Sequence, residues 1–101
     1  MGFTISPAAR TAPTLPLGRV MATPDAVEAL IAARCDGGEL LDRHARGDWG
    51  DLEAHDRAAN DRAVTEGQRV LSAYTLRTGV TQWIATEHDR SCTTLLLPSD
   101  Y

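Results

Sequence analysis

The feature that most constrains the fold is a change of sequence pattern at Gly67. Before this residue, apolar side chains recur at helical spacing; after it, short runs rich in β-branched and aromatic residues alternate with polar turns. The runs 69–76, 80–86 and 91–97 predict three strands, and Thr78-Gly79 supplies a tight turn between the first two. Strands that follow one another through short turns favour an antiparallel meander.

Three helices are predicted before that point. The first begins with Thr23 as its N-cap, has a proline at its first helical position and ends near Cys35. A second covers 39–46, and a third runs from a cap at Asp51 to Gly67. We therefore expect an α+β fold in which three N-terminal helices pack on one face of a three- or four-stranded antiparallel meander sheet.

A length of 101 residues suits one domain with its own core. Residues 1–16 contain three prolines among Ser, Thr and Ala, which predicts a flexible N-terminal arm. Residues 17–101 then form a single α+β domain. A weak strand signal over 17–22 supplies the fourth strand if it joins the sheet.

Charge argues against a nucleic-acid-binding protein. The net charge is -4, and no basic patch marks the sequence, so we expect no direct DNA binding. The acidic residues are unevenly placed, because positions 36–66 hold nine carboxylates against four arginines. That span is either a set of solvated helical faces or an acidic surface for a basic partner, such as a nucleic-acid-binding site on another protein.

Cysteine usage and hydropathy indicate a cytoplasmic protein. Cys35 and Cys92 lie far apart and form no CxxC pattern, so we expect both thiols to be reduced. The N-terminus lacks the apolar core of a signal peptide, and no segment approaches the roughly 20 apolar residues of a membrane span. No membrane association is expected.

The run RHARGDWGDL over 43–52 concentrates glycine, aspartate, arginine, histidine and tryptophan between two predicted helices. Trp49 is either a loop residue that folds into the core or an interface hot spot, for which Trp is a favoured type. In the second interpretation, the contacts to a protein partner are Asp48, Trp49, Asp51 and Asp56.

Common catalytic and cofactor motifs are not found. The sequence contains no GxSxG, P-loop or dinucleotide fingerprint, and the spacings of its three histidines match no standard zinc pattern. We therefore predict no metal and no cofactor, and an enzymatic role is the less favoured interpretation.

One polar turn nevertheless supports an alternative. Glu87, His88 and Arg90, together with His44, are residue types that can cleave a phosphodiester by general acid–base catalysis with a cation on the phosphate. The simpler interpretation is a polar turn in which Asp89 accepts backbone N–H groups and Arg90 pairs with a carboxylate.

Three strings, RHARGDWGDL, AANDRAVTEGQRVLSAYTL and WIATEHDRSCTTLLLPSDY, resemble a family of small bacterial proteins encoded on plasmids and integrated elements. The resemblance covers residues 17–101, with departures at Ala85 and Cys92, where the family has aliphatic residues. Members carry labels such as plasmid-related protein or restriction-enzyme subunit; the second label implies a methyltransferase cofactor domain, for which this sequence shows no motif. The resemblance implies a mobile-element setting but no established activity or catalytic residues.

Three functional hypotheses follow. The first is a non-enzymatic accessory protein of a mobile element that binds a host protein complex and inhibits a defence system, of the CRISPR or restriction type, through an acidic surface. The second is a small ribonuclease or toxin of barnase-like architecture that uses His and Arg on the sheet, an analogy of element order alone. The third is a structural partner, such as an antitoxin-like binder or a homodimer joined through an exposed sheet edge.

Overall fold

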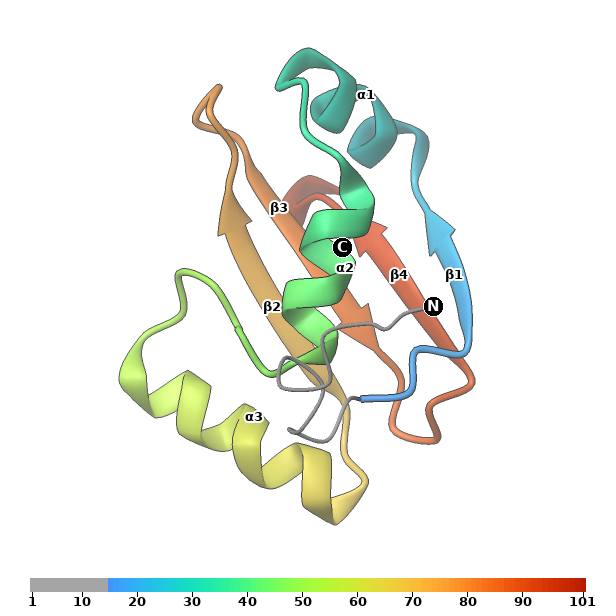
Figure 1. Cartoon of the computed structure of the whole chain (residues 1–101), viewed down its shortest axis with the longest axis vertical. Coiled ribbons are helices and arrows are strands. Elements are labelled where there is room, and N and C mark those ends of the chain that lie inside the picture. Colours follow the sequence, from blue (N-terminus) through green and yellow to red (C-terminus); the bar gives the residue numbers. More distant parts are fainter. Residues whose placement is uncertain (1–14) are drawn as a thin grey trace, which may run out of the picture.

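The computed structural model describes residues 15–101, so most of the arm expected over 1–16 lies outside the described residues. The elements of regular structure, in chain order, are β1 (Arg19–Ala22), α1 (Pro24–Ala32), α2 (Gly37–Ala45), α3 (Ala54–Glu66), β2 (Val70–Thr75), β3 (Thr81–Thr86), β4 (Cys92–Leu96) and the short 3-10 helix η2 (Pro98–Asp100) (Figure 1).

The sheet has the order β1-β4-β3-β2 and is mixed. β2, β3 and β4 pair antiparallel, whereas β1 pairs parallel to β4, with Arg19 opposite Cys92. The expectation of an all-antiparallel meander that follows three helices is therefore wrong, because a strand precedes the helices and joins the sheet as an edge strand parallel to β4. Local pattern shows that 17–22 can be extended, but it carries no information about a partner at the far end of the chain.

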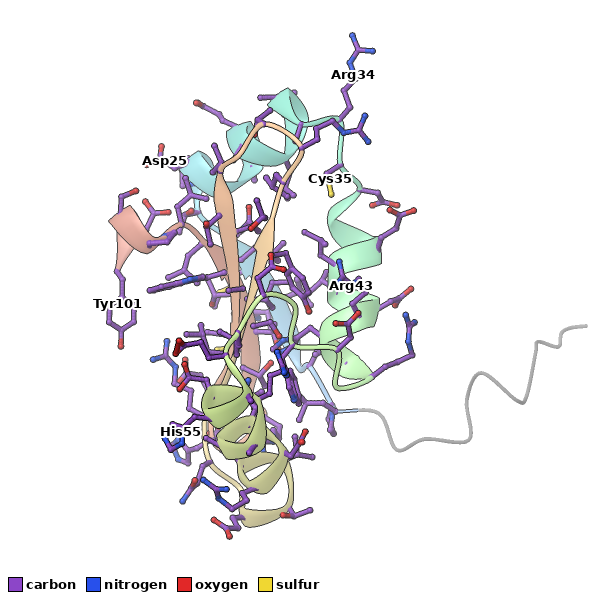
Figure 2. The ribbon with its side chains drawn as sticks, turned by 90° about the vertical axis from the view of Figure 1, so that its left-hand side faces the viewer. Asp25, Arg34, Cys35, Arg43, His55 and Tyr101 are labelled. Atoms are coloured by element: carbon purple, nitrogen blue, oxygen red, sulfur yellow. The ribbon has the colours of Figure 1, made fainter. Side chains whose placement is uncertain are left out.

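The sequence analysis expected all three helices to pack on one face of the sheet, and this expectation is also wrong. α2 alone lies across a face, α1 sits at one end of the sheet, and α3 lies along the β2 side (Figures 1 and 2). The reason lies in what each helix can bury. α3 buries only Asn60 and Ala63, which is too little apolar surface for a helix that covers a sheet face.

Local signals set most helix ends. The Thr23 hydroxyl accepts the Ala26 N–H at 3.1 Å, as the sequence predicted, and α3 ends at Gly67 in a left-handed conformation. The predicted cap at Asp51 is wrong, because α3 begins after Glu53 and the Asp51 carboxylate bonds to β2 instead.

The core lies between α2 and the sheet. One cluster joins strand residues Tyr74, Ile84 and Leu95 to Leu40 of α2 and Ala26 of α1. A second cluster forms where the loop after α2, α3 and the N-terminal segment meet β2; its buried members are Leu15, Trp49, Ala63 and Val70. Among residues 15–101, no helix is long and apolar enough to cross a membrane.

Candidate functional site

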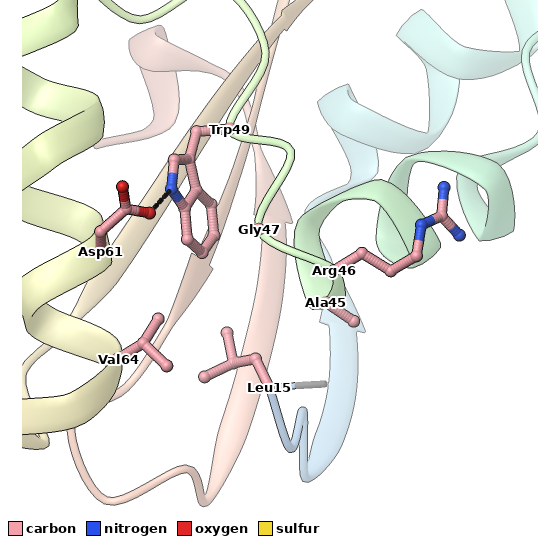
Figure 3. Close-up of a pocket in the computed structure, with 7 residues that line it drawn as sticks. All are labelled: Leu15, Ala45, Arg46, Gly47, Trp49, Asp61 and Val64. Atoms are coloured by element: carbon pink, nitrogen blue, oxygen red, sulfur yellow. Dashed lines mark hydrogen bonds between the residues drawn. The ribbon is translucent and has the colours of Figure 1, made fainter. Parts of the chain in front are cut away.

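Trp49 is a core residue. Its side chain is 3% exposed, packs with Val70 and Ala63, and stands edge-on to His44 with ring centroids 5.6 Å apart. The indole N–H donates to Oδ1 of Asp61 at 2.9 Å (Figure 3). A buried tryptophan whose polar atom is bonded inside the protein stabilises the fold, so in this conformation it offers no exposed ring to a partner.

Residues 48–51 run beside β2 and cover its outer edge. The Ala73 N–H donates to the Trp49 carbonyl at 3.2 Å, and the Asp51 N–H donates to the Ala73 carbonyl at 2.7 Å. One carboxylate oxygen of Asp51 then accepts the Thr75 N–H at 2.8 Å. This segment imitates a fifth strand, because it supplies partners for backbone groups that an edge strand leaves free.

Gly50 makes this close approach feasible. Its φ is +79°, and it forms a parallel bridge to Ala73. A Cβ at this position would press into the Ala73 carbonyl oxygen and lie 2.7 Å from the Tyr74 ring. Both the backbone conformation and the available space therefore require glycine here.

Asn60 of α3 completes the cover of β2. Its side-chain amide donates to the Leu71 carbonyl at 2.7 Å, and its Oδ1 accepts the Leu71 N–H at 3.3 Å. The amide thus pairs with a strand residue as a neighbouring backbone would. We call this outer side of β2, at Leu71, Ala73 and Thr75, the sealed edge.

Asp48 is exposed, but its contacts are with residues of the same loop and of α2. Its carboxylate pairs with Arg43 at 2.7 Å and accepts the Gly50 N–H at 3.2 Å, and these contacts lower the pKa of Asp48, Arg43 most of all. The Arg43 guanidinium lies over the Tyr74 ring, 4.6 Å from its centroid. The Tyr74 hydroxyl in turn donates to the Asp48 carbonyl at 2.6 Å. Two of the proposed contact carboxylates, Asp48 and Asp51, are thus used to fix the loop.

Asp56 remains available to a partner. It is exposed in the first turn of α3 and lines a pocket of about 240 Å³. The other lining residues are Leu52, Ala59, Asn60 and Leu71. The pocket places one carboxylate beside an apolar wall at the β2 side of the sheet.

A second pocket, of about 210 Å³, opens between the end of α2 and α3 (Figure 3). Its lining residues are Leu15, Ala45, Arg46, Gly47, Trp49, Asp61 and Val64. None of these seven is a histidine, serine or cysteine, so the pocket offers space for an aliphatic group but no pair suited to nucleophilic catalysis.

His44 lies at the centre of a buried chain of hydrogen bonds. Its Nδ1 is 2.5 Å from the Ser72 hydroxyl and its Nε2 is 2.8 Å from the Thr86 hydroxyl, which contacts the Thr93 hydroxyl at 2.8 Å. Thr93 donates its proton to the Leu17 carbonyl at 2.7 Å. Because that carbonyl can only accept, Thr86 donates to Thr93, Nε2–H donates to Thr86, and Nδ1 accepts from Ser72.

This environment keeps His44 neutral. The side chain is 0% exposed, and burial, helped by the charge of Arg90, lowers its pKa to about 4. A neutral imidazole with both nitrogens bonded and no solvent contact cannot reach a substrate. His44 instead ties α2 to three strands, through Ser72 of β2, Thr86 of β3 and Thr93 of β4.

The residues of the proposed nuclease site do not converge. Arg90 donates to the Ala63 and Gln68 carbonyls at 2.9 and 2.7 Å, so it caps the end of α3. Glu87 pairs with Arg69 at 3.7 Å, and His88 is exposed in the turn. None of the catalytic candidates lines either pocket at α3. The expected turn bond is present, since Asp89 accepts the Ser91 N–H at 3.0 Å.

The sheet face opposite α2 is the site that sequence reasoning missed. We call it the open face, because among residues 15–101 no helix longer than η2 lies across its middle (Figure 2), although Ala73, Ala85 and Leu96 within it are buried by their neighbours. Side chains alternate across a strand, and the pairing register therefore places there Met21, Leu71, Ala73, Trp83, Ala85, Thr94 and Leu96. A usable signal existed: the strands carry apolar residues such as Leu71, Trp83 and Leu96 on this face, where a face exposed to water would be polar.

An aromatic pair marks the open face. Trp83 is half-buried and meets Tyr101 edge-on at 5.8 Å, and Tyr101 is 77% exposed. Arg69 donates to the Tyr101 hydroxyl at 3.1 Å and pairs with Glu87. The open face therefore combines apolar area with an aromatic pair and a charged rim, and Leu71 makes it continuous with the pocket at Asp56.

Metal chemistry finds no support in the geometry. Within residues 15–101, no group of three or more His, Cys, Asp or Glu side chains is placed to hold a metal ion. Cys35 and Cys92 are not bonded to one another. The acidic span 36–66 is divided between α2, α3 and the loop that joins them, so it does not form one continuous helical face.

Comparisons with known proteins identify no relative: no family model, no curated protein and no solved structure matches the chain. The resemblance of the three long strings to a plasmid-borne family therefore stays a sequence-based prediction.

Proposed function

We propose that this protein is a non-enzymatic binding module of a mobile genetic element that attaches to a host protein complex in the cytoplasm. The observation that carries the proposal is the open face, an apolar sheet surface on which Trp83 is half-buried and Tyr101 is 77% exposed. Trp, Tyr and Arg are the residue types that dominate binding energy at protein interfaces. The mobile-element setting rests on the family resemblance.

The chemistry of the open face favours an apolar protein segment over a small substrate. Its apolar centre has a charged rim at Arg69 and Glu87, the arrangement of many protein interfaces. The covered face shows what fits a sheet of this size, because the nine residues of α2 extend across it. We infer that the partner presents an amphipathic helix.

In this proposal, the acidic part of the interface is formed by Asp56 and the exposed side of α3. Asp56 lines the pocket that shares Leu71 with the open face, so a helix docked there would lie beside this carboxylate. A basic partner, such as a nucleic-acid-handling defence complex, would be attracted by such an arrangement, and salt would weaken the attraction. Asp48, Trp49 and Asp51 then act by holding the scaffold.

The test is a comparative pull-down from a host lysate, followed by titration of the recovered partner. Thr94→Arg places a positive charge at the centre of the open face, and Ile31→Arg places the same charge on an exposed apolar position of α1 as a matched control. We expect the control to retain the partner and Thr94→Arg to weaken its affinity at least 10-fold. Equal affinity for both variants would remove the open face from the interface.

Salt dependence and Asp56→Asn test the acidic component separately. If the affinity for the partner falls with salt in the wild type and less steeply in Asp56→Asn, the carboxylate contributes to attraction. An affinity that changes neither with salt nor in Asp56→Asn would contradict the acidic-surface hypothesis and indicate a purely apolar interface. RNA cleavage by wild type and by His88→Ala tests the ribonuclease alternative in the same preparation.

A further inference from the structure

β1 forms the second edge of the sheet. The backbone groups of alternate β1 residues point toward β4 and away from it. The Arg19 N–H donates to the Ser91 carbonyl at 3.0 Å and the Thr23 N–H to the Leu95 carbonyl at 2.9 Å, so odd-numbered residues face β4. The N–H and C=O groups of Val20 and Ala22 therefore point away from the sheet. Within residues 15–101, no strand or side chain pairs with this open edge.

Opposite charges mark the two ends of the open edge. Arg19 at the beginning is exposed and makes no salt bridge among the described residues. At the other end, Asp100 accepts the Thr23 hydroxyl at 2.7 Å, and its hydrogen bond with Asp25 raises the pKa of Asp25. The neighbouring carboxylates of Asp25 and Asp100 favour the approach of a cation. Figure 2 shows Asp25 and Tyr101 on the same side of the sheet.

We propose that the open edge binds a second copy of this chain, with the two β1 strands antiparallel about a twofold axis at Met21. In that register, Val20 of each copy exchanges both its backbone hydrogen bonds with Ala22 of the other, and every outward group of β1 is paired. The two sheets become one continuous sheet.

The charges select a second copy over an unrelated strand. Antiparallel pairing brings Arg19 of one copy opposite Thr23 of the other, on the same sheet face, with Cβ atoms about 4.5–5.5 Å apart. An arginine side chain reaches from there to Asp100 and Asp25, which adjoin Thr23. The charges at the two ends of the open edge are thus complementary to those of a second copy that runs antiparallel to it.

Apolar contact accompanies these charges. Val20 is 46% exposed and Met21 is 42% exposed, and the proposed register brings Met21 against Met21 of the other copy and Val20 against its Ala22. The strand is four residues long, so the interface is smaller than a standard one of roughly 1,600 Å². We expect a reversible dimer with a Kd on the order of 10 µM.

The dimer has a consequence for binding. Odd-numbered residues of β1 belong to the open face, so antiparallel pairing places the open faces of both copies on one side of the joined sheet. If the open face binds as proposed above, each dimer presents it twice. The dimer itself does not depend on that proposal, and the following measurements need no partner.

The first test is sedimentation equilibrium of the full chain across the micromolar range. Wild type is expected to pass from monomer to dimer as concentration rises. Val20→Pro removes an outward N–H that makes no bond within the monomer, and it is expected to stay monomeric at all concentrations with an unchanged circular dichroism spectrum. A wild type that is monomeric at 100 µM, roughly ten times the expected Kd, would overturn the proposal.

A charge swap tests the register. Arg19→Glu alone and Asp25→Arg alone each create like-charge contacts across the twofold and are expected to weaken self-association at least 10-fold. Their equimolar mixture restores both opposite-charge contacts and is expected to form heterodimers. Arg77→Glu makes the same charge change at an exposed turn and is expected to dimerise as wild type does. Monomers in the mixture, or dimers insensitive to both single changes, would place the contact elsewhere.

Discussion

The two edges of the sheet differ in how the chain treats them. At β2, the loop after α2 and the amide of Asn60 partner the outward N–H and C=O groups of Leu71 and Ala73 and the N–H of Thr75. At β1, the outward groups of Val20 and Ala22 have no partner within residues 15–101. Proteins that stay monomeric usually protect both edges, so an asymmetry of this kind indicates where further pairing can occur.

The comparison of the two edges also shows the role of the most conspicuous sequence motif, because residues 48–51 of that motif cover the β2 edge. RHARGDWGDL is the most distinctive run in the chain, yet its main residues all make contacts inside the protein. His44 ties α2 to the sheet, Asp48 fixes the loop, Trp49 fills the core, and Gly50 and Asp51 pair with β2. The residues left for partners, Trp83 and Tyr101, lie outside this run.

The largest effect is expected where the sealed edge is tightest. Gly50→Ala adds a Cβ against the Ala73 carbonyl at a positive φ, and we expect it to lower the free energy of unfolding by about 3 kcal/mol or more. Gly67→Ala is the control, since its φ is +71° but nothing lies within 4 Å of the new Cβ, so it costs about 1–2 kcal/mol from backbone strain alone. Urea unfolding measures both, and equal losses would mean that strain rather than contact governs Gly50.

The free energy of unfolding is expected to fall in mild acid, because of the buried histidine between α2 and the sheet. His44 has a pKa of about 4 in the folded protein and about 6.5 when unfolded, so protonation favours the unfolded chain. Stability should be full above pH 6.5 and fall by about 3 kcal/mol as pH decreases to 4. Urea midpoints between pH 4 and 8 measure this fall.

Histidine variants assign the acid sensitivity. His44→Gln is expected to be less stable at neutral pH and to lose most of the slope between pH 6.5 and 4. His55→Gln and His88→Gln alter exposed side chains and should keep the wild-type slope. A slope that survives in His44→Gln would show that other groups cause the acid effect.

A smaller effect is expected from Asn60→Ala, which removes both side-chain bonds to Leu71. Leaving those backbone groups without a protein partner costs about 1–3 kcal/mol. Amide hydrogen exchange at Leu71 should quicken accordingly, whereas Gln68→Ala, at an exposed position after α3, should leave it unchanged. Unchanged protection at Leu71 in Asn60→Ala would mean that α3 does not seal this edge.

The smallest effect on monomer stability is expected from Val20→Pro at the open edge, within about 0.5 kcal/mol. Proline at the sealed edge is the contrast: Ala73→Pro removes the N–H that bonds to the Trp49 carbonyl and should cost about 3 kcal/mol. Thermal unfolding at low protein concentration compares the two. Similar losses would contradict the difference between the edges.

Much of the local structure could be predicted from the sequence. The cap at Thr23, the helix end at Gly67 and the turn at Gly79 depend on short-range chemistry, and the structure confirms each. The candidate contacts fared differently, because burial is not a local property. The sequence left Trp49 either in the core or at an interface, and the structure places it in the core, whereas Asp48 is exposed. Nothing in their neighbours reveals that the loop folds against β2.

By itself, the sequence determined which segments are helical or extended and some of their ends, such as the cap at Thr23 and the end at Gly67, because capping, turn chemistry and side-chain spacing act within a few residues. Only the tertiary structure decided that β1 pairs parallel with β4, that residues 48–51 and Asn60 seal β2, and that one face and one edge stay open. Those outcomes depend on contacts between residues distant in the chain, whose free energies no local pattern encodes.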